Sequence, residues 1–271
     1  MEPSPLRFLS ADHPLEEARV VILGVPLERG VSFRGGPAFA PNAIRQASWS
    51  LESFSHYVRK DLVEVGVCDL GDLDAERSRE EVFRALEASV RELVRAGKRV
   101  VVLGGDHSVS LGGVRGAMSA VGKLQVLVLD AHSDLRDEYL GDRFSHACVS
   151  RRISELVGRL VIVGARSFFG PDLDEPFFAE LGEIPERLSR GIPLWLSLDL
   201  DVLDPGAFPG VTNPEPGGLS FRDLLEVLHV LRGFEVVGMD VVELAPPFDP
   251  SGVSAITAAK LVIEAILHLW G

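Results

Sequence analysis

The sequence predicts an α/β fold in which helices cover a parallel β-sheet. Short apolar runs with the length of buried strands alternate with segments in which apolar residues recur every three or four positions. The chain has 271 residues, of which 46% are hydrophobic, and this is enough for one large domain with a well-covered sheet. Because no linker, repeat or low-complexity run divides the sequence, we expect a single domain over residues 1–271.

The predicted elements follow one another along the chain in a regular order. Strands are expected near Val20, Val63, Val100, Leu124, Leu160, Leu194 and Val236. The clearest helices are expected over Arg79–Ala96, Phe221–Leu231 and Ser254–Trp270, where the apolar spacing is helical.

Three metal-capable side chains stand at alternate positions directly after the apolar run 124–129. They are Asp130, His132 and Asp134. Alternate side chains of an extended segment point to the same side, so these three can converge on one point.

Two further apolar runs end in similar clusters. His107 follows the run 100–103 within Gly-Gly-Asp-His-Ser, and Asp199 and Asp201 follow the run 192–196. Ligands of open parallel sheets bind outside the carboxyl ends of the strands, so we expect the three clusters to share one pocket. Gly104 and Gly105 are expected to let the backbone turn sharply before His107.

These clusters together predict a binuclear metal site. The candidate ligands are His107, Asp130, His132, Asp134, Asp199 and Asp201. An oxygen-rich set with two imidazoles suits Mn²⁺ better than the Cys- or His-rich sets typical of Zn²⁺. Helix capping explains the clusters poorly, because a cap needs one residue and each cluster supplies two or three. By strand alternation Asp106 faces away from His107, and we interpret it as structural.

Composition narrows the possible partners and location. The formal net charge of −13 argues against nucleic-acid binding by a basic surface and is compatible with a cationic substrate. The first residues lack the basic flank and apolar core of a signal peptide, and no apolar stretch approaches the roughly 20 residues that span a bilayer. Two cysteines, Cys68 and Cys148, do not make a disulfide framework. We therefore expect a cytoplasmic protein with neither nucleic-acid nor membrane partners.

Several separated motifs occur in a specific order. They read GVPLERG (24–30), FRGGPAFAPNAIR (33–45), GGDHS (104–108), DAHSD (130–134), SLDLDVLDP (197–205), PEPGGLS (214–220) and DVVEL (240–244). This set resembles the arginase/agmatinase/formiminoglutamase, or ureohydrolase, superfamily, and its prokaryotic agmatinases most closely. The resemblance implies an arginase-like, three-layer α/β/α fold with a mostly parallel sheet of about eight strands.

The resemblance also implies how the ligands divide between two Mn²⁺ ions. One ion would be held by His107, Asp130, Asp134 and Asp199, and the other by His132, Asp130, Asp199 and Asp201. Asp130 and Asp199 would then bridge the ions, which would share a hydroxide able to attack a guanidinium carbon.

Three residues take catalytic roles by the same resemblance. Asp134 would also pass a proton toward the leaving nitrogen, and His146 would shuttle protons between bulk water and the leaving amine. Glu243 would pair with the substrate guanidinium through charge-assisted hydrogen bonds.

The choice of substrate depends on residues away from the ligands. The amino-terminal motifs favour agmatine or a related guanidino amine or polyamine, which would yield urea and, from agmatine, putrescine. Arg136 stands where arginase-type chains usually carry Asn, which disfavours arginine. Arg136 either meets a substrate carboxylate, as in a formiminoglutamase, or pairs with Asp137, Glu138 or Asp142.

The superfamily also contains functions that these motifs do not separate from an agmatinase. Guanidinobutyrase activity and a non-catalytic regulatory role are both compatible with the resemblance. Members of the superfamily are commonly trimers or hexamers, so the resemblance implies a homo-oligomer.

Overall fold

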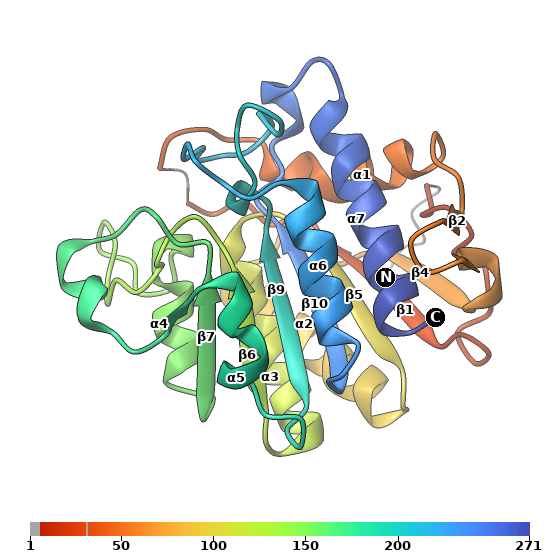
Figure 1. Ribbon diagram of the computed structural model, residues 1–271, viewed down its shortest axis with the longest axis horizontal. Coiled ribbons are helices and arrows are strands. Elements are labelled where there is room, and N and C mark those ends of the chain that lie inside the picture. The colour runs from red at the N-terminus through yellow and green to blue at the C-terminus, as the bar shows by residue number, and fades with distance from the viewer. Residues whose placement is uncertain (1–5, 31) are drawn as a thin grey trace.

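An eight-stranded parallel sheet runs through the computed structural model, which describes residues 6–30 and 32–271 (Figure 1). The strands of this sheet are β1 (Val20–Val25), β4 (Val67–Asp72), β5 (Arg99–Gly104), β6 (Gln125–Leu129), β7 (Arg159–Val163), β8 (Phe178–Ala179), β9 (Leu194–Asp199) and β10 (Val236–Val242). Their order across the sheet is β4-β1-β5-β10-β9-β6-β7-β8, and every pairing is parallel. Two further strands of two residues each, β2 (Phe54–Ser55) and β3 (Lys60–Asp61), form a separate antiparallel pair.

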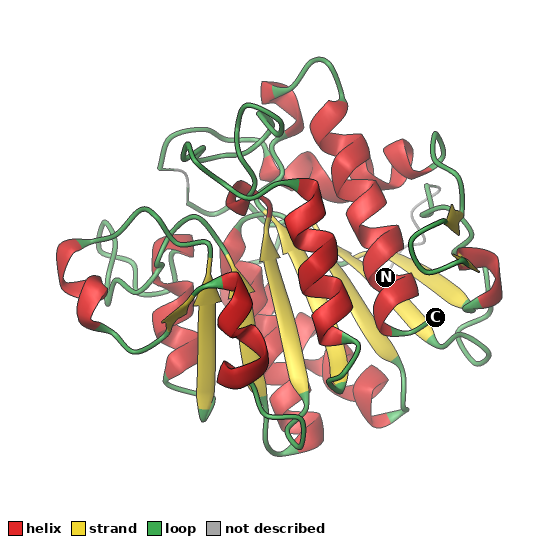
Figure 2. Ribbon diagram, viewed as in Figure 1, coloured by secondary structure: helices red, strands yellow, loops and turns green. Residues whose placement is uncertain are grey.

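Helices cover both faces of the sheet, which confirms the three-layer α/β/α architecture (Figure 2). The helices in the described residues are α1 (Ala40–Ser48), α2 (Arg79–Arg95), α3 (Ser110–Val121), α4 (Val149–Ser154), α5 (Ile184–Arg187), α6 (Phe221–Leu231) and α7 (Val253–Leu269). One hydrophobic core joins α1, α5, α6 and α7 to the sheet, and a second joins α2, α3 and α4 to the opposite face. The sheet is therefore buried on both sides, as parallel sheets are.

The longest predicted helices end within one residue of the predicted positions. Helix α2 begins after Ser78, whose side chain forms a capping box with Glu81, and it ends before Gly97. Ser220 and Asp223 form the same motif at the start of α6. Residues 261–267 of α7 are buried in the core, so this apolar segment packs inside the chain.

Two strand predictions differ from the structure. Residues Leu62–Glu64 form a short 3-10 turn, and the strand expected near Val63 begins only at Val67, after Gly66 adopts a φ of 75°. Strand β8 has two residues, which is too short to give a periodic signal.

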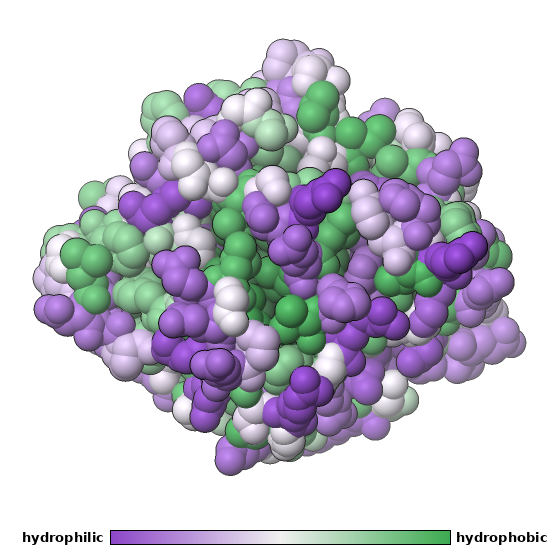
Figure 3. Space-filling model, in the orientation of Figure 1, coloured by the Kyte–Doolittle hydropathy of each residue, from purple (hydrophilic) through white to green (hydrophobic). Residues whose placement is uncertain are grey.

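The exterior agrees with the composition. Figure 3 shows hydrophilic residues over much of one face and hydrophobic residues gathered near its middle, between α5 and α6. No helix in the described residues has the length and apolar character needed to cross a membrane. Cys68 and Cys148 are both free and buried.

Candidate metal centre

The carboxyl ends of three strands from the middle of the sheet bring the predicted ligands together. Strand β5 leads to His107, which begins the short 3-10 helix η3 (His107–Val109). Strand β6 leads to Asp130, and β9 ends at Asp199, directly before the 3-10 helix η7 (Leu200–Val202). Since β5, β10, β9 and β6 are adjacent in the sheet, all three ligand segments open onto the same edge.

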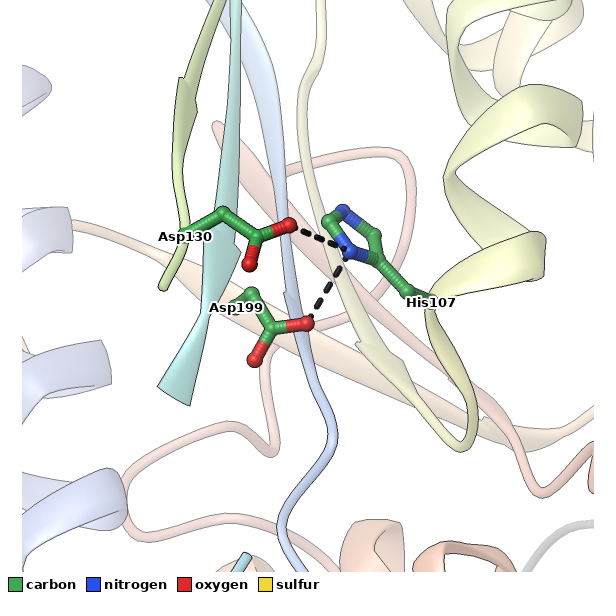
Figure 4. A group of neighbouring side chains, drawn as sticks. All are labelled: His107, Asp130 and Asp199. Carbon is green, nitrogen blue, oxygen red and sulfur yellow. Dashed lines mark ion pairs between the residues drawn. The ribbon is translucent and has the colours of Figure 1, made fainter. Parts of the chain in front are cut away.

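The first group of ligands surrounds His107 (Figure 4). Its Nδ1 atom lies 3.1 Å from Asp130 Oδ2 and 3.0 Å from Asp199 Oδ2. Asp134 Oδ2 lies 3.3 Å from the same nitrogen. We call His107, Asp130 and Asp199 the first triad.

The second group surrounds His132. Its Nδ1 atom lies 2.9 Å from Asp201 Oδ2 and 3.5 Å from Asp130 Oδ1. We call Asp130, His132 and Asp201 the second triad. Asp130 gives one oxygen to each triad, whereas the Oδ1 atom of Asp199 accepts a hydrogen bond from Asp201 N at 2.9 Å. The role of Asp199 as a second bridge stays a prediction.

Two atoms at the centre of the first triad fit a bound cation. His107 Nδ1 and Asp130 Oδ2 are fully buried, and neither makes a hydrogen bond within the described residues. Buried polar atoms are seldom left in this way unless an ion or water completes them. Four carboxylates gathered around two imidazoles also leave an excess of negative charge, which two divalent ions would neutralise.

The pKa values express the same excess of negative charge. Burial alone lowers the pKa of His132, but hydrogen bonds and charges from Asp130 and Asp201 outweigh it and raise the pKa to about 12. The pKa of His107 is likewise raised well above its ordinary value, because three carboxylates outweigh burial. Burial and then the neighbouring Asp201 and Asp130 raise the pKa of Asp199. Raised pKa values of this kind are what an excess of negative charge produces, and a bound cation would relieve the same excess.

A buried hydrogen-bonded chain orients the first triad. Ser197 Oγ lies 3.1 Å from His107 Nε2 and donates to Asp240 Oδ1 at 2.7 Å. Asp240, in the middle of β10, also accepts hydrogen bonds from Ser110 Oγ and Trp195 Nε1 at 2.8 and 2.6 Å. This chain fixes the imidazole so that Nδ1 faces the carboxylates. The sequence reasoning missed the role of Asp240, although a carboxylate within an apolar strand is a signal for one.

The two glycines before His107 provide space for the backbone. The backbone bends at Gly105 and Asp106, directly before His107, and neither glycine has a positive φ, so the bend does not depend on a left-handed conformation. A Cβ atom on Gly105 would lie 2.0 Å from Leu27 O, and one on Gly104 would lie 2.6 Å from Val109 Cγ2. Asp106 accepts hydrogen bonds from Arg29 N and Ser108 N, which agrees with its structural interpretation.

A pocket opens over both triads and includes the three predicted catalytic residues. Asp134, His146 and Glu243 all line it, together with Thr212 and Asn213. Glu243 Oε1 accepts a hydrogen bond from His107 N at 2.6 Å, and Oε2 accepts one from Thr212 Oγ1. Burial and then the charge of Asp106 raise the pKa of Glu243 to about 8. Asp134 and Glu243 both have positive φ, a conformation that non-glycine residues adopt mainly where the surrounding structure enforces it.

His146 lies at the wall of the pocket. Its Nε2 atom is 3.3 Å from Ser32 Oγ, and its Nδ1 atom is 3.5 Å from Ser145 Oγ. The ring is partly exposed and meets the edge of Tyr139 at a centroid distance of 6.0 Å. This position links the pocket to solvent.

Arg136 also lines the pocket, stacked on aromatic rings. Its guanidinium carbon lies 4.4 Å from the centroid of Phe169 and 5.5 Å from that of Tyr139. Asp137 instead pairs with Arg143 and Arg152, and Asp142 pairs with Arg79. Within the described residues Arg136 forms no ion pair, so the predicted pairing of Arg136 with Asp137, Glu138 or Asp142 is wrong.

Strand-end carboxylates and imidazoles arranged in this way, under an open pocket, define a metal-dependent enzyme. Comparisons with known proteins agree. The model of the arginase family matches residues 18–268. The agmatinase of Halalkalibacterium halodurans is 33% identical over 96% of this chain and 95% of its own length. The mitochondrial arginase 1 of Arabidopsis thaliana is 38% identical over 92% of this chain and 80% of its own.

Solved structures show the same relationship. The agmatine ureohydrolase of Thermoplasma volcanium superposes with a TM-score of 0.90 at 32% identity, covering 98% of this chain and 94% of that one. The chain belongs to the arginase family, as its motifs predicted, and is a metal-dependent amidinohydrolase that is agmatinase-like.

Proposed function

We propose that the protein binds two Mn²⁺ ions and hydrolyses the guanidinium group of agmatine to urea and putrescine. The observation that carries this proposal is the pair of triads, which share Asp130 beneath a pocket lined by Glu243. Full-length similarity to agmatinases supports agmatine over other guanidino compounds. The net charge of −13 also favours a cationic substrate.

The six candidate ligands would hold the ions: His107, Asp130, His132, Asp134, Asp199 and Asp201. When bound, two divalent ions lower the pKa of a shared water toward neutrality and so supply the nucleophile that the poorly electrophilic guanidinium carbon requires.

Glu243 would orient the substrate. Its carboxylate is already fixed by His107 N and Thr212 Oγ1 and faces the pocket. A guanidinium placed against it would lower the raised pKa of Glu243 and favour its ionised form, which would then make charge-assisted hydrogen bonds to the substrate. These bonds would hold the central carbon of the guanidinium toward the triads.

Asp134 and His146 would move protons. Water adds to the guanidinium carbon, the bond from that carbon to the substituted nitrogen breaks, and the leaving amine must take up a proton. Asp134, 3.3 Å from His107 Nδ1, would accept the proton of the attacking water and pass it to this nitrogen. His146, at the solvent side of the pocket, would exchange protons with bulk water.

A second candidate function is supported by Arg136. It is the one arginine or lysine among the described residues that line the pocket, and it forms no ion pair with a carboxylate of residues 6–30 or 32–271. Its guanidinium would attract a substrate carboxylate and repel a terminal ammonium group. This favours an amidine or guanidino acid such as formiminoglutamate or guanidinobutyrate.

One panel of substrates distinguishes these candidates. The Mn²⁺-loaded protein is tested for urea from agmatine, aminopropylated agmatine, arginine and guanidinobutyrate, and for formamide from formiminoglutamate, with His132→Ala as the control for metal-dependent turnover. We expect turnover of the amines, unaffected or increased in Arg136→Ala. Turnover confined to carboxylate substrates, and lost in Arg136→Ala, would support the second candidate. Two bound ions with no turnover of any compound would indicate a non-catalytic homologue.

We also propose a homo-oligomer in the cytoplasm. Exposed apolar side chains such as Phe33, Phe39 and Leu140 offer surface that a second copy could cover. The two free thiols suit a reducing compartment. Light scattering after size exclusion tests the assembly, and a mass of about 29.4 kDa would contradict it.

A further inference from the structure

The guanidinium group of Arg166, a residue with no predicted role, donates all of its hydrogen bonds within the described residues to backbone carbonyl groups. Its three nitrogens donate at 2.6–3.5 Å to the carbonyl oxygens of Gly164, Asp201, Val202, Leu203, Glu215 and Pro216. No carboxylate forms an ion pair with it in the described part of the chain. The side chain therefore serves to hold separate backbone segments together.

One of these segments carries a candidate metal ligand. Arg166 Nη2 donates to the carbonyl oxygen of Asp201 itself at 2.9 Å, and Nη1 donates to that of Val202 at 3.2 Å. The Oδ1 atom of Asp201 in turn accepts a hydrogen bond from Ala131 N at 3.1 Å.

The backbone of Arg166 holds the other two ligands of the second triad. Arg166 N donates to Ala131 O at 2.8 Å, and Ser167 N donates to the same oxygen at 2.9 Å. Ala131 lies between Asp130 and His132, so this contact fixes the extended segment that places both.

The third segment reaches the far side of His132. Arg166 binds the carbonyl oxygens of Glu215 and Pro216, and Asn213, two residues before Glu215, places its Nδ2 atom 3.1 Å from His132 Nε2. Every ligand of the second triad is thus tied to Arg166 directly or through one residue. In the first triad, Asp130 is shared and Asp199 is linked to Arg166 through Asp201, whose N donates to Asp199 Oδ1 at 2.9 Å. His107 is held by Ser197 and has no such tie in the described residues.

We propose that Arg166 is a positioning residue for the second triad and sets the affinity of the ion held by His132 and Asp201. The proposal rests on the proposed two-ion centre and is independent of which substrate is used. An arginine is needed because its planar group offers five N–H donors in a fixed fork, whereas a lysine offers three donors from one point.

Titration of the metal-free protein with Mn²⁺ tests this role, with free Mn²⁺ followed by electron paramagnetic resonance. In Arg166→Lys we expect the affinity for one of the two Mn²⁺ ions to fall about tenfold or more, because loss of a group that orients a metal ligand has an effect of this size. The affinity for the other ion should stay unchanged. Arg187→Lys is the matched control, because Arg187 is also partly exposed and donates to two carbonyls, those of Phe178 and Pro176, away from the pocket. Unchanged affinity for both ions, or equal weakening of both, would overturn the proposal.

Double variants identify the affected ion. In a His132→Ala background, Arg166→Lys should leave the remaining ion's affinity unchanged, whereas in a His107→Ala background it should weaken it. The opposite pattern would overturn the assignment. Fewer than two ions in the wild-type protein would refute the proposed centre itself, and thermal unfolding of each metal-free variant separates loss of folding from loss of an ion site.

Discussion

The two triads of the metal centre are built in different ways. His107 is 1% exposed and is oriented from inside the sheet by Ser197 and Asp240. His132 has an 18% exposed side chain and lies on a loop whose neighbours are held by the main chain of Arg166 and, through Asp201 and Glu215, by its guanidinium group. Two ion sites that share Asp130 therefore depend on separate supports, and each support can be changed without touching a ligand.

Replacing Asp130, the ligand that both triads share, should impair both ion sites together and should have the largest effect on activity. Asp130→Asn takes a charged oxygen from both triads, so we expect both ions to be lost at micromolar Mn²⁺ and kcat to fall about thousandfold, equivalent to about 4 kcal/mol. Metal content after gel filtration and urea release measure the two effects. Asp223→Asn, the same exchange in the capping box of α6, should change neither. Retention of one full ion by Asp130→Asn would contradict a shared role.

Glu243→Gln should weaken substrate binding and leave metal binding at both triads unchanged. Loss of a charge-assisted contact costs about 1.5–3 kcal/mol, so kcat/KM should fall about 10- to 100-fold while two ions remain bound. Steady-state kinetics and metal analysis on the same preparation check this. Loss of an ion at unchanged kcat/KM would show that Glu243 supports the metal centre and does not bind substrate.

Asp240→Asn should weaken the first triad alone, the reverse of the effect expected for Arg166→Lys. The amide cannot accept all the hydrogen bonds that Ser110, Ser197 and Trp195 donate. We expect about tenfold weaker binding of one ion, and a free energy of unfolding lower by about 1–3 kcal/mol. Mn²⁺ titration and urea denaturation measure these. Equal weakening of both ions would show that the supports are not separate.

Lowering the pH should weaken Mn²⁺ binding at both triads. Carboxylates raise the pKa of His132 to about 12 and that of His107 well above its ordinary value, so both imidazoles are protonated near neutrality without metal. An ion must displace these protons, and its apparent affinity should therefore rise with pH, about tenfold per unit for each proton displaced. Calorimetry between pH 6 and 8 in buffers of different ionisation enthalpy would detect the released protons. A pH-independent affinity would contradict the pKa values.

Local patterns predicted most of the strands, the long helices and the clustering of the candidate ligands, but they misplaced β4 and missed the two-residue β8. Asp130, His132 and Asp134 could be recognised because alternation along one segment determines where side chains point. Asp106 could be separated from His107 by the same rule.

The supports of the site could not be predicted in this way. Asp240 reaches His107 from a strand 133 positions later through Ser197, and Arg166 binds carbonyl groups, which every residue carries. Contacts of this kind have no residue-type signature in the sequence. Gly105 was interpreted as a turn residue, because the close approach of Leu27 appears only when the chain is folded.

The most direct test of the two-ion centre is urea release from agmatine measured as Mn²⁺ is added stepwise to the metal-free protein. If both ions are needed for catalysis, there should be little activity up to one bound ion per chain and a steep rise in activity as the second ion binds. Full activity with a single bound ion, or no urea from agmatine with two, would contradict this centre.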